Sequence, residues 1–148
     1  MLLGFMKQFT PKIVDGTKVL TNRIKRKDGK VPAYPGDTLY MYTGLRTPQC
    51  KRIFEKGKEK ECAGVWDIRF IPWGLGYIRV ESDFLIDVLC WRADYVDWER
   101  HPVDILERLA IMDGWNNFPE MADFFKPHYN EHMNLIYWGK GNKTCKRI

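Results

Sequence analysis

The sequence lacks several features that would assign its 148 residues to a common functional class. The apolar opening from Met1 to Met6 is far shorter than the roughly 20 residues that a membrane-spanning helix needs, and no basic leader or cleavage site accompanies it. The four cysteines lie far apart without a C-x-x-C pair, so no zinc or redox motif is indicated. We therefore expect a cytoplasmic protein with reduced thiols, no membrane association, no metal and no cofactor.

Two nucleotide-binding signatures and a histidine centre are also missing. Lys143 and Thr144 have no preceding glycine-rich loop, as a P-loop would require, and no Rossmann G-x-G-x-x-G occurs. Three histidines are present, and His101 is remote in sequence from His128 and His132. This distribution argues against a histidine metal site or a histidine general base.

Basic residues are in slight excess and are unevenly distributed. The formal net charge is +5 and the pI is about 9.0. Lysine and arginine cluster at 18–30, 51–60 and 140–147, whereas acidic residues concentrate between 81 and 123. Such segregation is typical of a basic face that binds a polyanion such as RNA, although unrelated surface loops would give the same distribution.

Composition and periodicity predict a single mixed α+β domain over residues 1–148. The hydrophobic content of 45% is in the ordinary globular range, so one continuous core is expected. Apolar alternation and turn residues predict strands at 3–6, 17–23, 38–43, 62–70, 77–81, 84–89 and 133–138, with helices at 10–14, at 102–112 and between 117 and 127. Their spacing favours a small curled sheet or barrel of about six strands with flanking helices.

The segment from Asp15 to Arg23 holds the densest group of candidate functional side chains. Lys18, Thr21 and Arg23 follow a glycine turn and could together hold an anion, a nucleotide or an acyl group. Side chains alternate in a regular strand, so Lys18 and Thr21 share a site only if Lys18 precedes the strand or a bulge separates them. Otherwise Thr21 is present for its strand propensity, and Lys18 is a solvated surface residue.

Four segments, in this order, resemble the ASCH domain. They are G-T-K-V-L-T-N-R at 16–23, P-G-D-T-L-Y-M-Y at 35–42, D-G-W at 113–115 and L-I-Y-W at 135–138. The resemblance covers nearly the whole chain and implies a PUA-like β-barrel of five or six strands with a helix-flanked cleft. It also implies RNA binding, ribonuclease activity as in some bacterial members, or removal of an acetyl group from N4-acetylcytidine.

The resemblance also implies catalytic residues. In the amidohydrolase members, G-x-K-x-x-T-x-R supplies a catalytic lysine and a threonine nucleophile, which correspond to Lys18 and Thr21. A glutamate before the last helix completes that site, and Asp113 lies nearest its position, with Glu107 and Glu120 as alternatives. A neighbouring cation such as Arg23 would lower the pKa of the lysine and help it accept the threonine proton.

We expect the chain to bind RNA or a modified nucleotide through a basic cleft, with a hydrolase or ribonuclease as the alternative. The predicted ligand-binding residues are Lys18, Arg23, Lys25, Arg26, Tyr42 and Arg46. An insertion-like region at 72–101 contains an acidic, tryptophan-rich stretch at 91–99, which could cover the cleft or make the chain a protein-interaction module. A short basic tail occupies 139–148, and no pattern predicts an oligomeric state.

Overall fold

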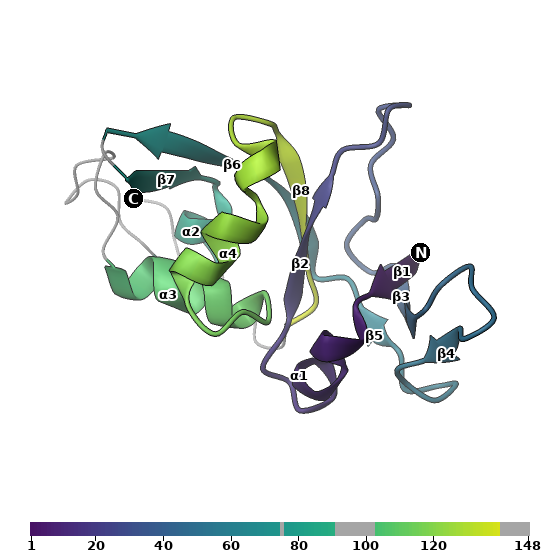
Figure 1. The fold of residues 1–148 in the computed structure, drawn as a ribbon. Helices are drawn as coiled ribbons and strands as arrows, with labels where there is room; N and C mark the ends of the chain where they lie inside the picture. Colours follow the sequence, from purple (N-terminus) through teal and green to yellow (C-terminus); the bar gives the residue numbers. More distant parts are fainter. Residues whose placement is uncertain (75, 91–102, 140–148) are drawn as a thin grey trace.

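Figure 1 shows the computed structural model of the chain, which describes residues 1–74, 76–90 and 103–139. The tryptophan-rich stretch at 91–99, His101 and the basic tail beyond residue 139 lie outside the described residues. Every helix in the described ranges is too short or too polar to cross a lipid bilayer.

The described residues form a mixed α+β fold, as predicted. The strands are β1 (Leu2–Phe5), β2 (Leu20–Ile24), β3 (Thr38–Thr43), β4 (Lys51–Arg52), β5 (Lys60–Glu61), β6 (Gly64–Trp73), β7 (Tyr77–Glu81) and β8 (Met133–Tyr137). The helices are η1 (Lys7–Phe9), α1 (Thr10–Val14), α2 (Phe84–Asp87), α3 (Val103–Met112), α4 (Phe118–Phe124) and η3 (Lys126–His128).

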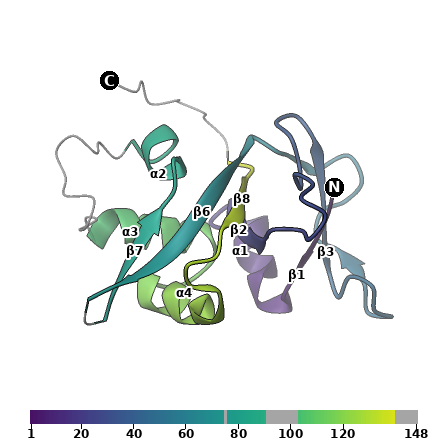
Figure 2. The same ribbon diagram turned by 90° about the horizontal axis from the view of Figure 1, so that it is seen from above.

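The strands are arranged in two sheets. Both sheets have four strands. The sheet with the longer strands, called the larger sheet, has the order β2-β8-β6-β7 with antiparallel neighbours. In the smaller sheet, β3 pairs in parallel with β1 and antiparallel with β4 and β5. Figures 1 and 2 show α3 and α4 at one end of the molecule and the smaller sheet at the other, with β2 and β8 between them. Strand β2 is therefore the edge of the larger sheet that lies nearest the smaller one.

Local capping explains why several elements begin where they do. Pro11 lies in the first turn of α1, where its missing N–H costs nothing. The Asn117 side chain accepts a hydrogen bond of 2.9 Å from the Glu120 amide and caps α4. Both helices were predicted from these residues.

Two strand predictions need correction. The strand predicted at 17–23 begins only at Leu20, which leaves Lys18 in the connection before β2. The strand predicted at 84–89 is wrong, because Phe84–Asp87 is helical. Ser82 Oγ donates to the Asp67 carbonyl over 2.6 Å and accepts from the Phe84 amide, so the chain turns into α2 directly after β7. The short strands β4 and β5 lie in a segment without a clear alternating pattern.

The core is one continuous cluster formed by both sheets and the helices. Fully buried side chains include Leu20, Ile68, Phe70, Leu109, Met121 and Leu135. Cys50 and Cys62 are free thiols, whereas Cys90 is disulfide-bonded, so the expectation of four reduced cysteines is wrong at Cys90.

Candidate functional site

A buried ion pair joins the connection before β2 to the end of α3. Lys18 Nζ lies 2.8 Å from Asp113 Oδ1, and the two side chains are only 2% and 4% exposed. Their backbones are fixed by a neighbouring bond, in which the Val19 amide donates to the Met112 carbonyl over 2.8 Å. Two segments separated by 95 residues in sequence thus meet at one buried contact.

All three N–H groups of the Lys18 ammonium are used within the protein. They donate to Asp113 Oδ1 at 2.8 Å, to the Asp113 carbonyl at 2.6 Å and to the Leu20 carbonyl at 2.8 Å. Burial lowers the pKa of Lys18, and the charge of Asp113 opposes this effect. Because a neutral amine has only two N–H donors, three acceptors at these distances select the charged form.

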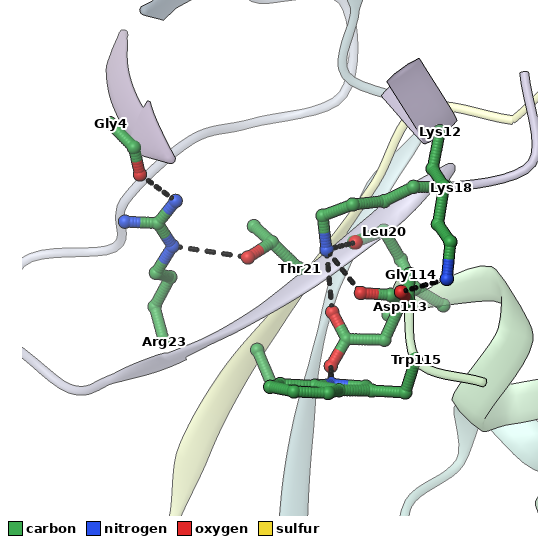
Figure 3. Close-up of polar contacts among 10 residues, drawn as sticks. Gly4, Lys12, Lys18, Leu20, Thr21, Arg23, Asp113, Gly114 and Trp115 are labelled. Carbon is green, nitrogen blue, oxygen red and sulfur yellow. Dashed lines mark hydrogen bonds and ion pairs between the residues drawn. The ribbon is translucent and has the colours of Figure 1, made fainter. Parts of the chain in front are cut away.

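The second oxygen of Asp113 is also occupied. Asp113 Oδ2 accepts from Trp115 Nε1 at 3.0 Å and from Asn22 Nδ2 at 3.1 Å. Asp113 therefore orients Lys18, Asn22 and Trp115 as the centre of one network, part of which is drawn in Figure 3.

A tight turn at Gly114 allows this network to form. Gly114 has a φ of +90°, and a Cβ there would lie 2.8 Å from a ring carbon of Phe9 and 2.9 Å from Lys18 Cδ. Lys12 Nζ stabilises the same turn by donating to the Gly114 carbonyl at 2.8 Å and to Asn116 Oδ1 at 3.0 Å. Only glycine satisfies both the backbone angle and the close approach.

Arg23 and Thr21 form a second polar group beside this network. Arg23 Nε donates to Thr21 Oγ1 over 3.1 Å, and an Arg23 Nη donates to the Gly4 carbonyl over 2.5 Å, which links β2 to β1 (Figure 3). The guanidinium also packs over the Phe5 ring at 4.9 Å. Of its five N–H groups, the described part of the chain uses two, and the Thr21 hydroxyl hydrogen has no acceptor there.

These residues line a cavity of about 200 Å³. Its polar walls are Lys18, Thr21, Asn22, Arg23 and Asp113, and its aromatic walls are Phe5, Phe9, Trp115, Phe124 and Phe125. Phe124 is 48% exposed and packs on Trp115 with 4.7 Å between ring centroids, so the cavity reaches the surface beside an aromatic pair. Drug-sized ligands usually occupy about 300–1,000 Å³, and this cavity is suited to a smaller group such as one ring system.

The structure brings part of the predicted site together. Lys18, Thr21, Arg23 and Asp113 all line the cavity, which is possible because Lys18 precedes β2. Among the candidate carboxylates, Glu107 instead accepts from the Phe118 amide, and Glu120 is an exposed partner of Asn116. Asp113 is therefore the acidic residue at this cavity.

The other predicted ligand-binding residues do not line the cavity. Lys25 pairs with Asp67 at 2.7 Å, and Arg26 pairs with Asp28 at 2.9 Å on the exposed surface. Tyr42 lies opposite Arg52 in the smaller sheet, and Arg46 is exposed in the loop after β3.

Sequence reasoning missed Asn22, Trp115 and Lys12 as partners of the site. Asn22 and Trp115 lie within two of the segments that resemble the ASCH domain, but nothing in the sequence indicates that both donate to one carboxylate. Lys12 lies on α1 and has no distinguishing pattern. Hydrogen-bonding capacity next to a charged residue was the only available signal.

The described histidines lie outside the cavity. His128 contacts Glu131, and His132 contacts Asp67 on the surface. Among residues 1–74, 76–90 and 103–139, no group of three histidine, cysteine, aspartate or glutamate side chains is placed to hold a metal ion. Compared with protein-family models, curated proteins and solved structures, the chain has no match.

Proposed function

We propose that the chain is an ASCH domain with a PUA-like barrel fold, and that it binds RNA or a modified nucleotide by inserting a base into the cavity. Two of the segments that carry the ASCH resemblance supply its polar walls: 16–23 contributes Lys18, Thr21 and Arg23, and 113–115 contributes Asp113 and Trp115. The Arg23 bond to Gly4 links the two sheets that a barrel would combine.

The observation that carries the proposal is an ion pair whose hydrogen-bonding groups all have partners, next to an arginine that keeps unused N–H donors. Removing two charges from water is costly, so a buried pair contributes little net stability compared with apolar residues. Here the pair fixes Asn22 and Trp115 at the cavity wall. Arg23 keeps N–H donors for a phosphate or carbonyl, and the exposed ring of Phe124, which packs on Trp115, offers a stacking surface for a base.

The experiment measures binding of labelled single-stranded RNA and of nucleoside monophosphates at increasing salt. Arg23→Gln removes the positive charge and the guanidinium at the cavity and should weaken binding about 10- to 100-fold, as expected for hydrogen bonds to charged groups worth about 1.5–3 kcal/mol. Arg108→Gln removes the same charge from the exposed face of α3 and is the control. Equal binding by the two variants, with unchanged melting temperatures, would contradict the proposal.

Hydrolysis of an N-acyl nucleoside is a second candidate function, favoured by the position of Thr21. Its hydroxyl lines the cavity, and its hydrogen has no acceptor among the described residues. In this reaction Thr21 Oγ would attack the acyl carbonyl, the amine would leave with a proton, and water would release the acid and restore the hydroxyl. A base must first accept the Thr21 proton, and Lys18 cannot do so while it donates three hydrogen bonds.

Hydrolysis of N4-acetylcytidine to cytidine and acetate tests this second function. Because neutral Lys18 is required, the rate should rise with pH as the lysine loses its proton. Thr21→Val keeps the side-chain shape and should abolish turnover. A full rate in Thr21→Val, or no turnover by the unmodified protein at any pH, would exclude this function and leave the binding function standing.

A further inference from the structure

The side-chain oxygen of Asn22 is a buried acceptor without a partner. Asn22 is 7% exposed, and its Nδ2 donates to Asp113 Oδ2 at 3.1 Å. Since an ionised carboxylate only accepts hydrogen bonds, the amide nitrogen has to face Asp113, and this fixes the place of the oxygen. Asn22 Oδ1 meets no donor within the described part of the chain.

Such an arrangement is unfavourable for the empty protein. Leaving a buried carbonyl without a hydrogen bond costs about 1–3 kcal/mol, and most buried polar groups in proteins are paired. The hydrogen bond to Asp113 uses only the amide nitrogen of Asn22, so it does not explain why the amide oxygen lacks a partner. Asn22 lines the cavity next to Thr21 and Arg23, where a bound molecule can supply the missing donor.

We propose that Asn22 determines the specificity of the cavity: its Oδ1 accepts a hydrogen bond from an N–H group on the edge of the bound nucleobase. This inference rests on the proposed binding function and adds the chemistry of the ligand. The ligand edge that Asn22 selects therefore carries an amino or imino N–H, and Thr21 and Arg23, which also line the cavity, carry donors for an acceptor elsewhere on the ligand. A base without that N–H would leave Asn22 Oδ1 unpaired, and such sites reject the deficient analogue strongly.

The first test uses the unmodified protein and pairs of ligands that differ by deletion of the donor. Binding of CMP is compared with that of pyrimidin-2-one riboside 5′-monophosphate, and binding of AMP with that of purine riboside 5′-monophosphate. The analogues lack the base N–H donors and add no bulk. The tighter of CMP and AMP should bind at least about tenfold more tightly than its analogue, the equivalent of one hydrogen bond of about 1.4 kcal/mol.

The second test exchanges the residue. Asn22→Leu should bind a nucleotide and its donor-free analogue with equal affinity, whereas Asn134→Leu, on the neighbouring strand β8 and outside the cavity, should keep the full discrimination. Melting temperatures show whether each variant is folded. If Asn22→Leu does not fold, the ligand pairs still test the specificity of the unmodified protein.

The outcomes separate the two proposals. Equal binding of nucleotide and analogue by the unmodified protein would overturn the role of Asn22 and leave nucleotide binding intact. Discrimination that persists in folded Asn22→Leu would likewise overturn it. Failure of every nucleotide to bind would overturn the proposed function and the inference together.

Discussion

Two lysine–aspartate pairs in this protein have the same chemistry and nearly the same length but opposite surroundings. Lys18 and Asp113 are 2.8 Å apart with side chains 2% and 4% exposed, whereas Lys25 and Asp67 are 2.7 Å apart and both are 46% exposed. The buried pair is surrounded by further partners at fixed positions. The exposed pair adds one contact from His132 to Asp67 and faces solvent.

The difference shows that burial, not distance, decides what an ion pair does. Near the surface, water and salt screen the charges, and such pairs contribute at most about 1 kcal/mol. In the interior every donor and acceptor has to be matched, so the buried pair dictates where Asn22, Trp115 and Gly114 lie. We therefore assign the exposed pair to the ordinary surface and the buried pair to an organised site.

The largest expected effect comes from removing one lysine of each pair. Lys18→Met leaves the Asp113 charge buried without its counter-ion, and this should lower the free energy of unfolding by about 3–5 kcal/mol. Lys25→Met should change it by no more than about 1 kcal/mol. Urea unfolding of both variants measures the difference, and equal costs would abolish the distinction between the pairs.

The turn that holds Asp113 offers the next effect. Gly114→Ala combines an unfavourable positive φ with contacts of 2.8 and 2.9 Å, whereas Gly16→Ala at φ +86° has no atom within 4 Å of the new Cβ. Both should suffer the conformational cost of about 1–3 kcal/mol. The free energy of unfolding of Gly114→Ala should fall by about 1–3 kcal/mol more, because the new methyl group overpacks against Phe9 and Lys18. If thermal unfolding shows the two variants to be equally stable, the turn is not a close-packed support of the site.

Two tryptophan–aspartate hydrogen bonds allow the same comparison of a buried with a more exposed aspartate, this time with an uncharged donor. Trp115 Nε1 donates to buried Asp113 at 3.0 Å, and Trp66 Nε1 donates to half-buried Asp87 at 2.9 Å. Trp115→Phe should reduce stability by about 1.5–3 kcal/mol, the range for hydrogen bonds to charged groups, and Trp66→Phe by about half as much or less because water replaces the lost donor. A larger loss in Trp66→Phe would reverse the ranking of the two environments.

The smallest effect is a dependence on pH at the exposed pair. Partial burial raises the pKa of Asp67, but hydrogen bonds from Lys25 and His132 outweigh this and keep the pKa below its ordinary value. The ionised form is therefore favoured by folding, so its contribution is present above about pH 4 and is lost as the pH falls further. Asp67→Asn should lower the free energy of unfolding by up to about 1 kcal/mol at pH 7 and should leave it unchanged at pH 2. Titrated unfolding that shows the same cost at both pH values would contradict this.

The sequence predicted those elements whose signals are local. The strand Thr38–Thr43 and the helix α1 follow from alternation and from Pro11, and the cap of α4 follows from Asn117. The prediction at 84–89 was wrong because a short apolar run fits a buried helix as well as a strand, and the Ser82 contact to Asp67 decides between them.

The site was predictable only in part, for the same physical reason. Lys18, Thr21 and Arg23 lie in one short segment, so their grouping is visible in the sequence. Their meeting with Asp113 is a long-range contact set by packing, and the partnerless oxygen of Asn22 depends on which way an amide faces inside that contact. Periodicity carries no information on either.

The indole N–H signals of Trp115 and Trp66 in a nuclear magnetic resonance titration test most directly whether the buried network forms a binding site. Each signal is assigned by its Trp→Phe variant, and CMP, UMP and AMP are added in turn. Binding in the cavity should shift the Trp115 signal saturably and leave the Trp66 signal in place, because only Trp115 lines the cavity and donates to Asp113. An unmoved Trp115 signal at the highest concentration of every nucleotide would contradict a nucleotide site at the Lys18–Asp113 pair.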